Sequence, residues 1–225
     1  TLFGRNTSAG VININTAKPD SEGGGFVNLT VGNYDARTVQ GAINLPINEQ
    51  WNARIDAKHR ERDGFFTEVN SGADINSIDR SMVRAQLIRE DDDSSLRLIA
   101  DWAASDSVCC AAVISDRSAL SAVVTGVAAA ASNLGYGSAD PSDYEVALSS
   151  MPTDEVSDWG FSAEYNRDID GMNFASVTAY RDWESDVLRD GEMAGVDTAE
   201  ALTFTSNSSF SQELRLQGES GLVNW

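Results

Sequence analysis

The chain has 225 residues, and its 16 Lys+Arg against 35 Asp+Glu give a formal net charge of −19. This charge argues against a nucleic-acid partner, because binding to phosphates requires a basic surface. Apolar residues make up 41% of the chain, but the longest apolar run, residues 119–131, is too short to cross a bilayer as a helix. A helical membrane protein is therefore excluded. A β-barrel is not, because only alternate residues of its strands face lipid.

Period-two alternation of apolar and polar residues recurs along the chain and predicts β-strands. The eight predicted strands are residues 26–31, 38–45, 51–58, 81–89, 96–102, 159–165, 174–183 and 210–217. In the third of these strands the polar positions are Asn52, Arg54, Asp56 and Lys58. Three of these four side chains are charged, so this face of the strand must contact water. Several of the strands approach the length that a tilted membrane strand requires.

The predicted links between these strands alternate in length. After a short first link at 32–37, the links 46–50, 90–95 and 167–171 are short, and 62–79, 104–157 and 184–207 are long. Successive links of an up-and-down sheet lie at opposite ends, so all the long links are expected at one end. Outer-membrane barrels have this asymmetry, with short periplasmic turns and long extracellular loops. A soluble sandwich remains an alternative.

Aromatic residues lie near the ends of several predicted strands: Trp51, Trp102, Trp159, Tyr180 and Trp183. Membrane barrels carry aromatic girdles at these heights. Soluble β proteins also place aromatic residues there, so this pattern only supports the barrel interpretation.

The longest link contains two features of its own. Asp116 can cap an Ala-rich helix over residues 118–133, and Gly135 can end it, although a flexible loop is an equal alternative. Cys109 and Cys110 are either free or bonded to each other. Together with the distant His59 they offer too few ligands for a metal site, and none is predicted.

The sequence does not predict an enzyme. Its single histidine, His59, lies in the polar end of a predicted strand and leaves no nucleophile–base pair to assemble. The acidic run 91–93 lies in a tight turn and lacks the spacing of a calcium loop. Polar strand faces carry charges of both signs, and such a lumen can hold another protein element by ion pairs and hydrogen bonds. We therefore expect no catalytic residues and no cofactor.

The opening residues resemble the end of the plug domain of TonB-dependent outer-membrane receptors, in which a stretch "LFGRN…GG.INI.T..P" leads into the barrel. The positions that carry this motif are Leu2, Phe3, Gly4, Arg5, Asn6, Gly10 and Asn13. Ala9 departs from it, because a second glycine is frequent there. Residues 31–35, 45–57 and 62–65 resemble the family's first barrel hairpins, and 210–217 resembles a later strand.

The resemblance implies an all-β fold, namely a fragment of an antiparallel up-and-down transmembrane β-barrel. Residues 1–20 would be the C-terminal end of the plug, and residues 21–225 the N-terminal part of the barrel. The fragment would form an open, curved sheet of about 8 of roughly 22 strands. The chain begins at Thr1 without Met and ends at Trp225 inside a strand-like pattern, so we expect it to be a piece of a longer protein.

The resemblance also implies a function and a location. It implies a receptor of the bacterial outer membrane, in contact with lipid, that takes up a scarce and bulky ligand, with a ferric siderophore as the preferred candidate. Energy would come from the TonB complex through a region absent from this chain, and the ligand-binding residues stay unassigned. Two alternatives remain: a passive porin-like or adhesin-like outer-membrane barrel, and a secreted all-β binding protein.

Overall fold

The computed structural model describes residues 15–112, 126, 140–191, 195, 197, 199–220 and 223–225. The seven predicted plug-motif residues, Leu2 to Asn13, lie outside the described residues. The predicted helix over 118–133 also lies outside them, apart from Gly126. None of the helices among the described residues is long and apolar enough to cross a membrane.

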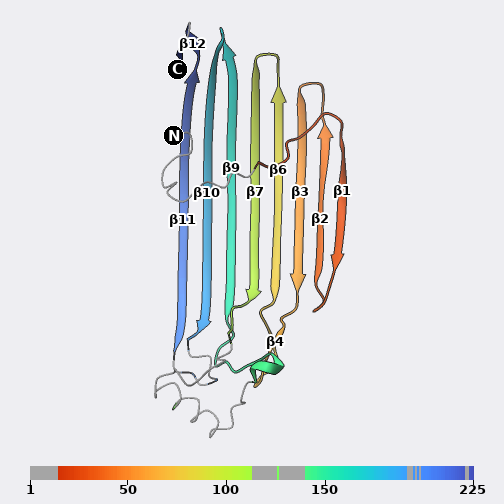
Figure 1. Cartoon of the computed structure of the whole chain (residues 1–225), viewed down its shortest axis with the longest axis vertical. Helices are drawn as coiled ribbons and strands as arrows, with labels where there is room; N and C mark the ends of the chain where they lie inside the picture. The colour runs from red at the N-terminus through yellow and green to blue at the C-terminus, as the bar shows by residue number, and fades with distance from the viewer. Residues whose placement is uncertain are drawn as a thin grey trace.

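Eight antiparallel strands form one sheet in which each strand pairs with its neighbour along the chain (Figure 1). They are β1 (Gly24–Val31), β2 (Arg37–Pro46), β3 (Trp51–Arg62), β6 (Ile78–Glu90), β7 (Ser94–Val108), β9 (Thr153–Ile169), β10 (Met172–Asp190) and β11 (Glu200–Gln217). Each of the eight predicted strands falls inside one of them, which confirms the antiparallel up-and-down prediction. The sheet is not closed, because β1 and β11 are its two edges.

The links follow the predicted asymmetry. The short links between β2 and β3, β6 and β7, and β9 and β10 lie at one end of the sheet, at the top of Figure 1. The links between β3 and β6, β7 and β9, and β10 and β11 lie at the opposite end, at the bottom. We call these two ends the turn end and the loop end.

The last four strands extend further toward the loop end than predicted. Residues 104–108, 153–157, 184–190 and 200–207 belong to strands β7, β9, β10 and β11, although the sequence pattern predicted links there. The first three stretches are rich in Ser, Asp and Glu and lack a sustained apolar alternation, whereas 200–207 alternates only over Leu202 and Phe204. They pair nonetheless, for example Asp106 with Glu155 and Asp186 with Glu155, because the register is already set by the apolar part of each strand.

A small second sheet covers part of the loop end. It consists of β4 (Phe66–Glu68), β5 (Asp74–Ile75) and β8 (Glu145–Val146), in the order β5-β4-β8, and a 3₁₀ turn, η1 (Pro141–Asp143), precedes β8. Its buried centre is formed by Ile75, Val146 and Leu148. Strands of two or three residues are too short to show a period, so the sequence did not reveal this sheet. A final hairpin pairs β12 (Glu219–Ser220) with β13 (Val223–Asn224).

The register gives the large sheet one apolar and one polar face. Ile43, Ile55, Ala85, Ala100, Phe161, Tyr180 and Phe210 form one row across seven strands of the apolar face. This face is open to the surroundings: Ile55, Trp102 and Phe161 are each more than 40% exposed. An uncovered apolar face of this size needs an apolar environment or a partner.

Candidate functional site: the polar face and the loop end

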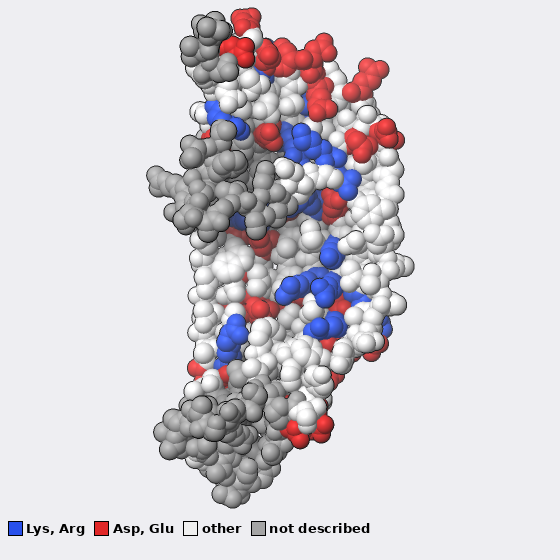
Figure 2. Space-filling model, in the orientation of Figure 1, with Lys and Arg blue, Asp and Glu red and all other residues white. Residues whose placement is uncertain are grey.

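The polar face of the large sheet carries charges of both signs, arranged across neighbouring strands (Figure 2). Arg54 and Asp56 of β3 form a bidentate pair, with Arg54 Nη2 and Asp56 Oδ1 2.8 Å apart. Asp56 lies opposite Arg84 of β6, which in turn lies opposite Asp101 of β7. The mixed charges predicted for a wet strand face are therefore arranged as cross-strand partners, which is the favourable arrangement.

A chain of ion pairs crosses four strands at this height. Asp101 accepts from Arg181 of β10 at 2.6 Å and lies 3.7 Å from Arg84, and Arg181 also donates to Asp158 of β9 at 2.6 Å. The guanidinium of Arg181 passes over Gly160 of β9, where an added Cβ would lie 2.9 Å from Arg181 Nη2. Glycine at this position therefore lets Arg181 bridge from β10 to β7.

We expect Asp101→Asn to lower the free energy of unfolding by about 1–2 kcal/mol, because it leaves two guanidinium groups beside one neutral amide in a partly solvated site. The measurement is urea unfolding of the full-length protein in lipid. Glu213→Gln, which removes an exposed partner of Arg215, is the control and should change stability by less than about 0.5 kcal/mol. Equal effects of the two substitutions would show that the ion-pair chain adds nothing.

The polar face also holds the chain that leads into β1. Gln86 Nε2 donates to Ala17 O at 3.0 Å, and Arg97 Nη2 donates to Thr16 Oγ1 at 3.1 Å. Pro19 is buried. Asp20 accepts a hydrogen bond of 2.6 Å from Asn44. Side chains of the polar face thus bind a neighbouring chain segment through its backbone and hydroxyl groups.

At the loop end, Glu68 fixes two separate segments together. Its side chain is buried and accepts hydrogen bonds from the backbone amides of Asn70, Ser71 and Leu148, and from the side chains of Asn70 and Ser71. Burial raises the pKa of Glu68, but the hydrogen bonds from Ser71 and from the amides outweigh burial, so its pKa lies below the usual value of 4.5. Glu68 therefore stays ionised and holds Leu148, in the last part of the link between β7 and β9, against β4.

Asp190, at the end of β10, holds the next residues of the β7–β9 link, Ser149 and Ser150, in the same way. It is 2% exposed, and it accepts hydrogen bonds from the amide and hydroxyl of Ser149 and from the amide of Ser150. No sequence pattern identifies Glu68 or Asp190, because nothing separates them from the rest of the 35 acidic residues until the chain is folded.

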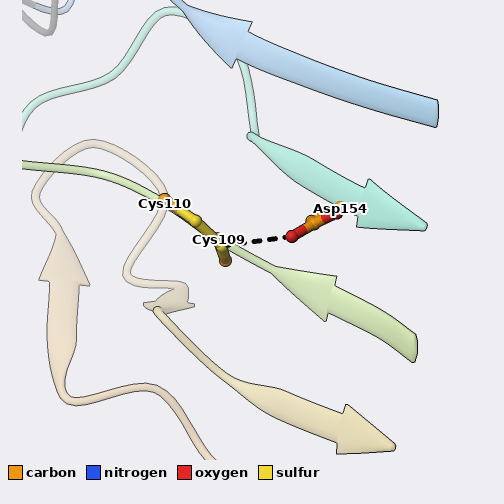
Figure 3. Close-up of side chains that lie close together, drawn as sticks. All are labelled: Cys109, Cys110 and Asp154. Atoms are coloured by element: carbon orange, nitrogen blue, oxygen red, sulfur yellow. Dashed lines mark hydrogen bonds between the residues drawn. A yellow bond between two sulfur atoms is a disulfide. The ribbon is translucent and has the colours of Figure 1, made fainter. Parts of the chain in front are cut away.

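Cys109 and Cys110 follow β7 and are joined by a disulfide (Figure 3). Between the alternatives of free and bonded cysteines, the structure has the bonded form. Asp154, at the start of β9, lies beside them, with its Oδ2 3.9 Å from Cys109 Sγ. In the described part of the chain, these three side chains form a group whose ligand atoms lie close enough together to bind one metal ion. With both sulfurs in a disulfide, no thiolate is available to a metal ion.

His59 and the acidic run 91–93, the polar groups considered for chemistry, have partners in the structure. His59 lies with its Nδ1 2.9 Å from Ser81 Oγ, at the polar end of β3, as predicted. Asp91 lies in the β6–β7 turn and contacts Arg89 at 2.7 Å and Gln50 at 2.7 Å. His59 also has two carboxylates nearby, with its Nε2 3.7 Å from Glu61 and its Nδ1 3.8 Å from Asp79.

No family model and no curated protein matches this sequence. Among solved structures, the chain is similar to the ferric yersiniabactin uptake receptor FyuA from Yersinia pestis, with a TM-score of 0.72 and 15% sequence identity. The likeness is one of fold. It covers 96% of this chain but 31% of that receptor, so the chain spans about a third of the receptor's length and corresponds to a fragment of its barrel.

Proposed function

We propose that this chain is part of a TonB-dependent receptor of the bacterial outer membrane that takes up a ferric siderophore. Residues 1–20 would be the end of the plug domain, and residues 21–225 the first part of the barrel. The observation that carries the proposal is the fold: a sheet of eight antiparallel strands similar, over 96% of the chain, to a receptor for a ferric chelate. The motif in residues 1–14 adds the family resemblance.

The two faces of the sheet support a place in the outer membrane. On the apolar face, Trp51 and Tyr165 lie in the same row of paired residues across the strands. Trp102 and Trp159 lie in a second row. These rows are six residues apart on β9, about 20 Å along the strand. Aromatic girdles bound the lipid-facing band of outer-membrane barrels at a comparable spacing. Beyond the Trp159 row the same face becomes acidic, with Glu61, Asp79, Asp106, Glu155 and Asp186.

The polar face supports a plugged lumen. A barrel of about 22 strands encloses a wide aqueous space that another element must fill. Gln86, Arg97 and Asn44 already hold residues 16–20 on this face. The ligand would be captured from outside by the loop end and the plug, and rearrangement of the plug on TonB engagement would open its path inward. No covalent chemistry is required.

Two experiments test the proposal. A strain that lacks the gene should lose uptake of at least one ferric siderophore under iron limitation, and the gene should restore that uptake only when the inner-membrane TonB system is intact. Unchanged uptake of every chelate tested would overturn the iron assignment. Uptake that persists without TonB would favour a passive porin-like barrel. Recovery of the full-length protein from the soluble fraction without detergent would favour a secreted all-β binding protein.

A further inference from the structure

Three cations lie together on the polar face, closer to the loop end than the ion-pair chain. Arg60 of β3 lies directly opposite Arg80 of β6, and Lys58 lies one row away on the same face. All three side chains are exposed. Like charges directly opposite each other on neighbouring strands are destabilising. The Arg60–Arg80 pair therefore lowers the stability of the β3–β6 pairing.

The three cations have no carboxylate partner in the described part of the chain. Three other arginines of this face differ, because Arg54, Arg84 and Arg181 each contact an aspartate. Arg97, nearer the turn end, has no carboxylate partner in the described part of the chain either, but donates to Gln86 and Thr16. Asp158 shares a row with Lys58, but its Oδ1 lies 2.6 Å from Arg181. Arg54, Arg84 and Arg181 are thus neutralised and Arg97 is occupied by neutral partners, whereas Lys58, Arg60 and Arg80 keep their charge available.

These cations line a hollow of about 440 Å³ on the polar face. Its other side is formed by Trp183 of β10, which is half-buried, and by Asp154, Val156 and Asp158 of β9. The floor consists of small residues of β7, Ala103 and Ser105, which leave space between the cations and the indole ring. A cationic wall facing an aromatic ring suits a planar, aromatic anion, because guanidinium groups pair with its oxygens and the indole stacks on its ring.

We propose that this hollow binds an anionic oxygen-donor group of the transported ligand, such as a catecholate or carboxylate arm. Arg60 and Arg80 would pair with its oxygens, and Trp183 would pack against its ring. The inference rests on the proposed function and makes it more specific: the receptor takes negatively charged ferric chelates and discriminates against neutral ones. The unfavourable Arg60–Arg80 arrangement is relieved when the anion binds.

The test compares two ferric chelates of similar size that differ in charge, and the inference predicts that the receptor binds one tightly and the other weakly. A ferric tris-catecholate carries three negative charges, whereas a ferric tris-hydroxamate is neutral. Binding of each is measured on the full-length receptor in detergent, by quenching of tryptophan fluorescence, for the wild type, for Arg60→Gln/Arg80→Gln, and for Arg89→Gln/Arg215→Gln. The last variant removes the same charge from two arginines that are ion-paired at the turn end.

We expect the wild type to bind the tris-catecholate more tightly, with an affinity that falls as salt rises. The Arg60→Gln/Arg80→Gln variant should lose at least about tenfold of this affinity, while the control variant keeps it. Without ligand, the first variant should unfold at the same or higher urea concentration than the wild type, because a repulsive pair is removed.

Equal tris-catecholate binding by the wild type and the Arg60→Gln/Arg80→Gln variant overturns this inference and leaves the proposed function intact. Tighter binding of the neutral chelate by the wild type also overturns it. A wild type that binds no ferric chelate of either charge counts against the proposed function itself, and the inference fails with it.

Discussion

Replacing Ala163 by arginine should lower the stability of the full-length protein in lipid by about 2–4 kcal/mol, whereas Ser162→Arg should cost less than about 1 kcal/mol. The two positions are adjacent on β9, and neither substitution removes a large side chain. Ala163 lies on the apolar face between Leu98 and Thr178, and Ser162 lies on the polar face between Ile99 and Ala179. The comparison therefore tests the environment of each face.

The physical reason is the medium that surrounds each face. Ala163 lies inside the band between the Trp159 and Tyr165 rows, where an arginine in lipid must leave water or distort the bilayer. Ser162 lies on the face that carries Arg54, Asp101 and Arg181, which is wet. The measurement is equilibrium unfolding in guanidinium from lipid vesicles. If both substitutions cost less than about 0.5 kcal/mol, the apolar face is not in lipid, and a secreted β protein becomes the better explanation.

Replacing Glu68 by alanine should open the small sheet at the loop end while the large sheet stays folded. The substitution leaves the buried amide of Leu148 and the amides of Asn70 and Ser71 without their acceptor. Loss of hydrogen bonds to a charged group predicts about 2–3 kcal/mol of local opening free energy, a roughly 30- to 160-fold larger opening constant. Hydrogen exchange of the amides of residues 66–75 and 145–150 measures it.

Asp74→Ala is the matched control, because Asp74 lies in the same small sheet but is exposed. Its hydrogen exchange should stay within about threefold of the wild type. Unchanged protection of Leu148 in the Glu68→Ala variant would contradict the role of Glu68. A loss of protection that spreads to β9 and β10 would show that the loop end and the large sheet unfold as one unit.

Acid should have the same effect as the Glu68 substitution. The folded-state pKa of Glu68 lies below the usual 4.5, so the carboxylate contributes stability that is fully present above that value. This contribution is lost as the pH falls through the folded-state pKa. Exchange of the Leu148 amide, corrected for its intrinsic rate, should therefore accelerate in acid. The Glu68→Gln variant lacks the titrating group and should show no such dependence.

The alternation of apolar and polar residues determined most of the large sheet. Side chains of a strand point alternately to its two faces, so a segment such as 159–165 reveals both its conformation and its two environments without knowledge of its partners. The same reasoning placed the charges of β3 on a wet face and the long links at one end. Because these properties depend on neighbours in sequence, they could be read before folding.

Tertiary structure alone decided which residues meet. Arg181 reaches Asp101 across 80 positions of sequence, and Glu68 accepts from the amide of Leu148 across another 80. The partners depend on the register between strands and on the path of a long link, and no local pattern records either. The extra length of β9 and β10 has the same origin, because the register of their apolar segments places their polar ends opposite each other. The sequence thus determined the strands and their faces, and the fold chose the partners.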